Sequence, residues 1–114
     1  MHELSIAESL IDMLKENGLT HHFTRVTKIT LEIGVLAGIE SASLFFCFAA
    51  VAQNTLAEGA QLVIESKPAI AICEHCQQQM SVTNYYDPCP CCGQLRVKIL
   101  QGEEMIIKSL EVEN

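Results

Sequence analysis

The sequence predicts an α+β protein: two helices packed on a small three-stranded sheet, with an inserted four-cysteine module resembling a zinc ribbon. Three observations predict this class. Apolar residues recur at helical spacing near the start, the next segment alternates strictly between apolar and polar residues, and two C-x-x-C pairs stand in the second half. The 114 residues, 49% of them hydrophobic, suffice for one modest core with an appendage.

Residues 4–15 are expected to form the first helix. One apolar stripe repeats at intervals of three and four residues, as in an amphipathic helix: Leu4, Ala7, Leu10, Ile11 and Leu14. Gly18 is a plausible residue to end the helix, because glycine readily adopts the left-handed backbone found just after helices. The segment 20–24 then reads as a polar connector.

Residues 26–36 are expected to form a strand, since apolar and polar residues alternate from Lys28 to Val35. A second helix is expected at about 42–53, capped by Ser41 or Ser43. This segment is apolar on nearly every side, so it should be the most buried helix of the protein.

Further strands are expected at 60–66, 95–100 and 105–112. The order of elements indicates an α+β domain of residues 1–67 plus 96–114, with a cysteine-containing module of residues 68–95 between its last strands. That module contains few apolar residues, so it should have almost no core of its own and depend on metal.

The zinc prediction rests on the spacing of four cysteines. Cys73-x-x-Cys76 is followed after twelve residues by Cys89-x-x-Cys92. Two such turns facing each other supply four thiolates in a tetrahedron, which is typical of a structural Zn(II) site. The alternatives are two disulfides or an iron centre with the same ligands. A third cysteine in the second turn, Cys91, is read as a spare thiol, although exchange of Cys91 or His75 into the site stays open.

Composition argues against several functions. The net charge is −7 and only seven lysines and arginines occur, scattered along the chain, so phosphate neutralisation and nucleic-acid binding are not expected. The longest apolar run, 44–52, is far shorter than the roughly 20 residues of a membrane span. The start resembles no signal peptide. We therefore expect a cytoplasmic protein whose thiols stay reduced and bind metal.

The first three residues form a candidate chelating set. The amine of Met1, the backbone nitrogen of His2 and its imidazole can occupy three corners of a square, and Glu3 can supply a further one. Square-planar nitrogen coordination suits Ni(II) or Cu(II) better than Zn(II). From spacing alone, the simpler interpretation is an exposed polar residue followed by a glutamate that favours a helix N-terminus.

The whole chain resembles the HypA/HybF family of nickel-incorporation proteins. The resemblance is carried by MHELSIAESL at the start, VTKITLEIGVLAGIE, the two cysteine turns and the ending MIIKSLEVE. It implies one transported Ni(II) at His2, with Met1 and Glu3 beside it, and one structural Zn(II) at Cys73, Cys76, Cys89 and Cys92. It also implies work with a HypB-type GTPase and nickel delivery to the [NiFe]-hydrogenase large subunit, in some organisms to urease.

Two competing classes stay open at this stage. One is a zinc-ribbon adaptor that binds protein partners and no nickel; the other is an electron-transfer protein with iron at the four cysteines. The sequence contains no phosphate-binding loop and no catalytic constellation, so no enzyme is expected. It does not decide between a monomer and a homodimer.

Overall fold

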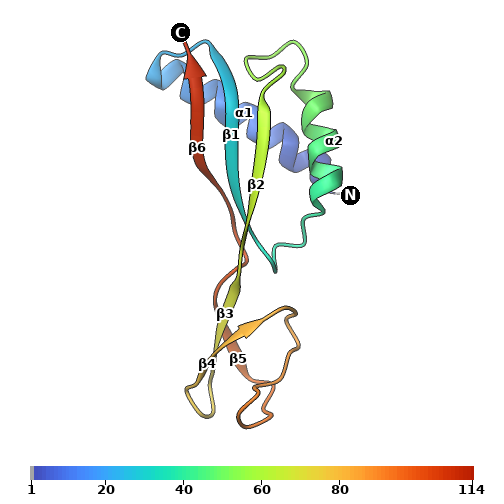
Figure 1. Ribbon diagram of the computed structural model, residues 1–114, viewed down its shortest axis with the longest axis vertical. Helices are drawn as coiled ribbons and strands as arrows, with labels where there is room; N and C mark the ends of the chain where they lie inside the picture. The colour runs from blue at the N-terminus through green and yellow to red at the C-terminus, as the bar shows by residue number, and fades with distance from the viewer. Residues whose placement is uncertain (1) are drawn as a thin grey trace. The chain divides into compact units, whose positions relative to one another are not determined.

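Residues 2–114, which the computed structural model describes, form two helices and six strands (Figure 1). In chain order these are α1 (Glu3–His21), β1 (Arg25–Gly34), α2 (Ser41–Val51), β2 (Gln61–Lys67), β3 (Ala69–Cys73), β4 (Gln79–Val82), β5 (Val97–Gln101) and β6 (Met105–Glu113). The predicted α+β class is confirmed. The strands form two sheets of three, ordered β2-β1-β6 and β4-β3-β5, where the sequence predicted a single sheet.

The chain divides into two compact units. The helical unit comprises residues up to 31 together with 39–64 and 107–114, and the cysteine unit comprises 32–38 and 65–106. The division into a nickel-binding domain and a zinc-binding module concerns function and stays a prediction. No helix among residues 2–114 is both long and apolar enough to cross a membrane.

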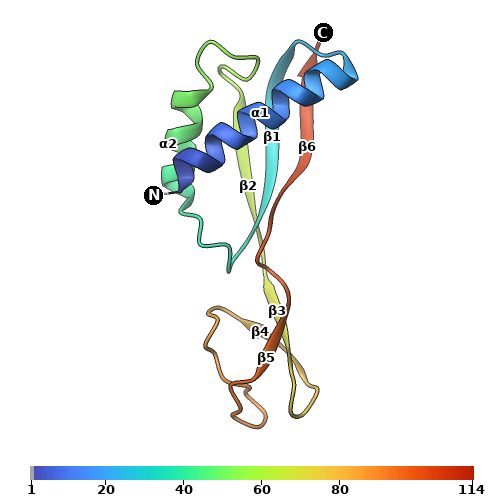
Figure 2. The ribbon, with the colours of Figure 1, turned by 180° about the vertical axis from the view of Figure 1, so that it is seen from behind.

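A strand–helix–strand unit underlies the first sheet. β1 and β2 run in the same direction with α2 as their crossover, and β6 runs against β1 on the other side (Figure 1). Where β1 begins and β6 ends, the Thr24 N–H donates to the Glu113 carbonyl at 3.0 Å. Both helices cover the same face of this sheet (Figure 2), so the core of the helical unit lies between that face and the helices.

The predicted apolar stripe of α1 is largely buried. Ala7, Leu10 and Leu14 are fully buried and Ile11 nearly so, while Leu4 remains 48% exposed. Val26, Ile29 and Leu31 of β1 are also fully buried, and each Å² of apolar area removed from water stabilises the helical unit by ~25 cal/mol. The alternating pattern of β1 and the helical pattern of α1 therefore identified opposite sides of one core.

The predicted end of α1 at Gly18 is wrong. The helix continues to His21 and is closed by His22, which takes the left-handed conformation (φ 62°). Gly18 lies at a tight approach, because a Cβ there would be 3.0 Å from the Phe23 carbonyl oxygen and 3.3 Å from the Leu56 side chain. Gly18 therefore marks a close approach of Phe23 and Leu56 to α1 and does not mark the end of the helix.

Two expectations for α2 are also wrong. The residue that caps α2 is Glu40, whose carboxylate accepts a hydrogen bond from the Ser43 N–H; neither Ser41 nor Ser43 is the cap. Nor is α2 the most buried helix, since its buried residues are only Leu44 and Phe48. Apolarity on every side does not require burial on every side, because α1 and the sheet cover only one face of α2.

The cysteine unit has its own sheet and core, contrary to the prediction. β3 pairs antiparallel with β4 and with β5, and Ala71 lies opposite Met80 and Ile99. Small buried residues of β3 pack with Leu36, Met80 and Val82, and with the partly buried Val97 and Ile99. Ala69, Ala71 and Cys73 are the buried residues of β3, and Ile70 and Ile72 between them are half-buried.

Three backbone segments of the cysteine unit cross at closest approach. A Cβ on Gly34 would lie 2.0 Å from the Gly102 carbonyl oxygen, and one on Gly102 (φ 106°) would lie 2.5 Å from Ala69. The Leu36 N–H donates to the Gly102 carbonyl at 2.8 Å. The crossing therefore requires residues without a side chain at positions 34 and 102.

Candidate metal centres

The cysteine cluster is built by two turns. Cys73 ends β3 and Cys76 closes the tight turn after it, where the Gln77 N–H donates to the Cys73 carbonyl at 2.9 Å. The second turn repeats this geometry, since the Gly93 N–H donates to the Cys89 carbonyl at 2.8 Å and Gly93 has a φ of 74°. Each turn thus presents two thiols on one side.

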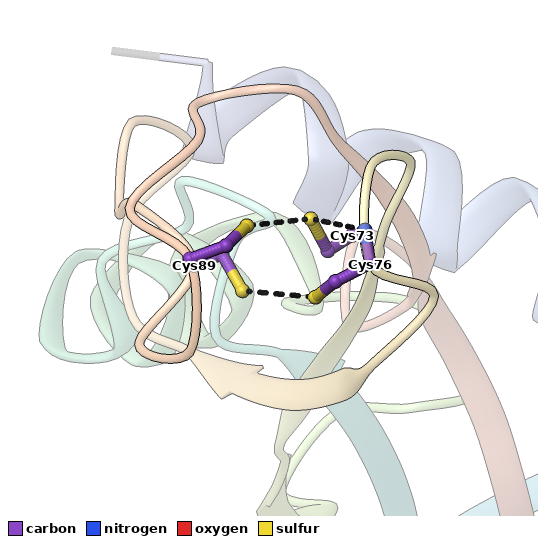
Figure 3. Close-up of side chains that lie close together, drawn as sticks. Cys73, Cys76 and Cys89 are labelled. Atoms are coloured by element: carbon purple, nitrogen blue, oxygen red, sulfur yellow. Dashed lines mark hydrogen bonds between the residues drawn. The ribbon is translucent and has the colours of Figure 1, made fainter.

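The four Sγ atoms of Cys73, Cys76, Cys89 and Cys92 lie within 4.8 Å of one another. The Cys73–Cys92 and Cys76–Cys89 Sγ distances are 3.6 and 3.7 Å, and Figure 3 shows the sulfurs of the labelled residues pointing together. Four thiolates at ~2.3 Å from a tetrahedral zinc would be about 3.8 Å apart. All six cysteines are free thiols. The donor set and its spacing therefore fit a four-thiolate metal site.

The electrostatics of the cluster also fit a cation. The backbone N–H of Cys92 lowers the pKa of Cys89 to about 6, and the backbone N–H of Cys76 lowers the pKa of Cys73. The backbone N–H of Gln78 lowers the pKa of Cys76. Burial and the neighbouring sulfurs of Cys89 and Cys73 outweigh this effect and raise the pKa to about 12. Each turn therefore readily supplies one thiolate, and ionising all four needs a positive charge between them.

Other residues near the cluster lie outside the four-sulfur group. Cys91 and His75 are both exposed. Of the two tyrosines in the loop between the turns, Tyr86 is 89% exposed and does not cover the cluster. The Tyr85 hydroxyl instead donates to Glu103 Oε2 at 2.7 Å and to the Leu36 carbonyl at 3.4 Å.

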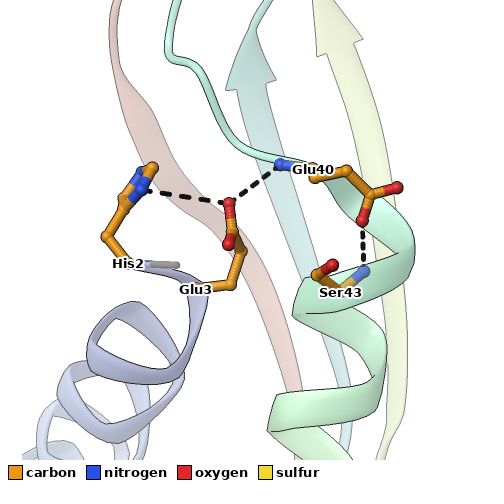
Figure 4. Close-up of polar contacts among 4 residues, drawn as sticks. All are labelled: His2, Glu3, Glu40 and Ser43. Atoms are coloured by element: carbon orange, nitrogen blue, oxygen red, sulfur yellow. Dashed lines mark hydrogen bonds and ion pairs between the residues drawn. The ribbon is translucent and has the colours of Figure 1, made fainter.

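The second candidate site lies at the start of α1. His2 precedes the helix and its side chain is 56% exposed, whereas the Glu3 side chain is only 7% exposed. His2 Nδ1 lies 3.9 Å from Glu3 Oε2 (Figure 4). Met1 lies outside the described residues, so its predicted role has no structural description.

Sequence reasoning missed the link between Glu3 and Glu40. Glu3 Oε2 accepts a hydrogen bond from the Glu40 N–H at 3.2 Å, which ties the start of α1 to the N-cap of α2 (Figure 4). The hydroxyl and N–H of Ser43 lower the pKa of Glu40 and keep it a carboxylate. No local pattern joins two glutamates 37 residues apart, so only the fold could reveal this contact.

The four-thiol cluster places the chain in the class of small metal-binding proteins, and His2 and Glu3 form a second group of polar residues at the start of α1. Comparison with known proteins specifies the class. Residues 1–112 match the family model described as hydrogenase/urease nickel incorporation, metallochaperone, HypA. The chain belongs to the HypA family of nickel-incorporation metallochaperones.

Relatives and solved structures agree with this assignment. The chain is 62% identical to the hydrogenase maturation factor HypA of Psychromonas ingrahamii over the whole length of both proteins. It is 48% identical to that of Azotobacter vinelandii, over 99% of this chain and 100% of the relative. The solution structure of the Ni metallochaperone HypA from Helicobacter pylori matches with a TM-score of 0.74 and 25% identity, over 99% and 98% of the two chains.

Proposed function

We propose that this protein binds one Ni(II) at its N-terminus and helps insert it into the large subunit of [NiFe]-hydrogenase, and into urease where one is present. The observation that carries the proposal is the exposed His2 imidazole next to the chain's first residue, in a member of a nickel-incorporation family. Nickel is the cargo of this reaction, and the protein acts without catalysis. We place it in the cytoplasm, as expected from its free thiols.

The proposed nickel ligands are Met1, His2 and Glu3. The His2 imidazole offers a nitrogen that is accessible to solvent. Together with the backbone nitrogen of His2 and the amine of Met1, it would form a chelate. The Glu3 carboxylate is held by the Glu40 N–H. Because nickel must displace protons from the nitrogen ligands, affinity should fall as pH falls. The exposure of His2 would also let a partner replace the ligands one at a time.

We assign a structural Zn(II) to Cys73, Cys76, Cys89 and Cys92. Bound there, zinc supplies the charge that keeps all four thiols ionised and ties the two turns together. Cys73 and Cys89 are buried, 0% and 2% exposed, whereas Cys76 and Cys92 are exposed, so one thiol of each turn faces the interior and one faces water. The residues that carry the cargo are thereby separate in sequence from those that maintain the fold.

The proposed partners are a HypB-type GTPase and the hydrogenase large subunit. The chain lacks a phosphate-binding loop of its own, so any nucleotide-driven step belongs to the partner. Its net charge of −7 supports protein partners and not nucleic acid.

Metal stoichiometry of the untagged, full-length protein tests the proposal. We expect one zinc and one nickel per chain. His2→Ala, or one residue added before Met1, should lower nickel affinity at least about tenfold, because each removes or displaces a ligand of the chelate, and leave zinc unchanged. His21→Ala, an exposed histidine at the other end of α1, is the matched control.

Equal nickel binding by all four proteins would place nickel elsewhere and refute the terminal site. Zinc without nickel in every protein would favour the alternative function, an adaptor that joins protein partners through the cysteine unit. A red, redox-active protein with iron in place of zinc would refute the zinc assignment.

A further inference from the structure

A large hollow lies at the carboxyl end of α1. It has a volume of about 990 Å³ and is bounded by the last turns of α1, the start of β1 and the loop after α2, all in the helical unit. Neither candidate metal centre contains any of its residues. We call it the α1-end hollow, and five of its lining residues matter below: Lys15, Leu19, Phe23, Arg25 and Leu56.

Part of this lining is apolar. Phe23 is buried and Leu56 is half-buried, whereas Leu19 is 81% exposed although it is a large apolar residue. An exposed leucine beside two covered apolar side chains offers a contact for an apolar group of a ligand, because both surfaces then leave water. The hollow is therefore suited to receive a large apolar side chain.

The charged part of the lining is entirely cationic. Lys15 and Arg25 are two of the chain's seven lysines and arginines, and among the described residues none of the acidic side chains lines the hollow. In a chain with a net charge of −7, this is a local reversal of sign. Such a reversal attracts anionic groups and disfavours cationic ones.

Both cations are available to a ligand. Lys67 is already paired with Glu32 at 3.5 Å, whereas Lys15 has no ion-pair or hydrogen-bond partner within residues 2–114. Arg25 Nη2 donates to the Glu58 carbonyl at 3.2 Å, and the Arg25 side chain is 53% exposed. A guanidinium has five N–H donors, so this contact holds Arg25 in place and leaves donors for a ligand.

Two groups near the hollow oppose an anion, and neither cancels the cations. Arg25 Nε lies 3.9 Å from Glu113 Oε1, which is longer than a hydrogen bond. The carbonyl end of a helix carries partial negative charge, but the Gly18 carbonyl already accepts from the N–H groups of His22 and Phe23. The hollow therefore keeps its cationic character.

We propose that the α1-end hollow binds an acidic segment of a protein partner, in which carboxylates flank a large apolar side chain. The apolar side chain would contact Leu19 and Leu56, and the carboxylates would meet Lys15 and Arg25. A small free anion would leave the apolar lining in water, and a neutral apolar segment would leave the cations without a counter-charge. The combination of both linings thus favours a segment that carries both kinds of group.

An NMR titration of the zinc-loaded, nickel-free protein in reductant tests the proposal. The probe is a blocked six-residue peptide with two central leucines and two aspartates on each side. We expect saturable amide shifts at Lys15, Leu19 and Arg25, with a Kd of about 0.1–1 mM, since a short peptide loses much conformational freedom on binding. Raising NaCl from about 20 to about 500 mM should weaken binding at least about fivefold.

Two comparison peptides separate the contributions of charge and apolar contact. Lysines in place of the aspartates should weaken binding at least about tenfold, and so should serines in place of the leucines. These comparisons need no variant of the protein. Equal binding of the lysine peptide or of the serine peptide would refute the proposal, as would shifts that lie outside the hollow.

Variants at exposed positions locate the contacts. Lys15→Glu and Leu19→Ser should each weaken binding of the aspartate peptide at least about fivefold. Their matched controls are Lys98→Glu and Leu95→Ser, which make the same changes at exposed positions of the cysteine unit and should bind as the unaltered protein does. Unchanged amide shifts away from the hollow show that each variant is folded, and unchanged affinity of Lys15→Glu or Leu19→Ser would contradict the proposal.

Two further outcomes would assign the hollow to another occupant. The same amide shifts with sodium acetate alone would show a site for small anions only. Shifts at the hollow that change when the protein is diluted without peptide would show that a second copy occupies it. Because nickel is absent and no metal ligand is altered, none of these results bears on the nickel proposal.

Discussion

Each cysteine turn contains one thiol that ionises easily and one that resists ionisation. The Cys92 N–H lowers the pKa of Cys89 to about 6. The Gln78 N–H lowers the pKa of Cys76, but burial and the neighbouring sulfurs outweigh it and raise that pKa to about 12. A cation between the turns would bring the resistant thiols into the thiolate form. Metal uptake should therefore release protons.

Substituting single cysteines should separate ligands from the spare thiol. On the zinc assignment, Cys73→Ser removes a buried thiolate, so the protein should lose its zinc and the link between the two cysteine turns. Cys91→Ser alters an exposed thiol outside the four-sulfur group and should keep one zinc per chain. Elemental analysis after gel filtration measures both, and zinc loss in Cys91→Ser would contradict the assignment.

Tyr85 should titrate above the ordinary tyrosine pKa of about 10. The hydrogen bond to Glu103 and the repulsion by its charge raise the pKa of Tyr85, because both favour the protonated phenol. The stabilisation this contact gives should be present at neutral pH and disappear as pH rises through the raised pKa. Glu103→Gln should return the titration, followed by ultraviolet absorbance, toward the ordinary value; an unchanged curve would argue against the contact.

At the residue scale, spacing along the chain was enough to find the cysteine cluster. The two-residue gap between the cysteines of each turn places both of their thiols on the same side of that turn. The ligand set could therefore be predicted without tertiary information: Cys73, Cys76, Cys89 and Cys92. The Glu3–Glu40 contact and the Tyr85 contact with Glu103 join distant segments. Neither has a local signature, and neither could be predicted.

At the scale of elements, periodicity predicted α1 and β1 because each buries one face. It failed for α2, where apolar residues on all sides concealed which face is covered. Periodicity did not reveal β3, whose buried residues are alanine and cysteine and whose isoleucines are half-buried.

Leu14→Ala should show how much α1 contributes. Leu14 is fully buried, so its truncation should lower the free energy of unfolding by about 3 kcal/mol through lost burial and a cavity. Met13→Ala, next to it but 43% exposed, should cost no more than about 1 kcal/mol. Urea unfolding followed by far-ultraviolet circular dichroism compares them, and equal losses would show that α1 packs by another face.

At the scale of the whole molecule, the sequence indicated an excursion between the last strands but missed the second sheet. The crossing of segments at Gly34, Gly102 and Ala69 explains the difficulty. Glycines in a strand sequence read as breaks, yet here they permit contact between backbones far apart in sequence. The resemblance to a known family then supplied the functional assignment, which composition alone could not.

Gly34→Ala should damage the cysteine unit severely. Its Cβ would lie 2.0 Å from a backbone oxygen, a clash that no side-chain rotation relieves, so we expect a loss of about 3 kcal/mol or more. The control is Gly38→Ala, at a φ of 71° but in open space, with an expected cost of about 1 kcal/mol. Both tyrosines lie in the cysteine unit, so tyrosine fluorescence during urea unfolding reports on it.

The pairing of β6 with β1 has a consequence for how fast the protein folds. The Thr27 hydroxyl donates to the Glu111 carbonyl across 84 positions of sequence, so the first sheet is complete only after the chain from Lys67 to Met105 has closed on itself. Loop closure costs about 0.6 kcal/mol for each doubling of length. By joining Cys73 to Cys92 first, zinc would shorten that loop, so metal present during synthesis should speed the docking of β6 by a small factor. Zinc would then act on the order of folding events in a part of the chain that contains none of its ligands.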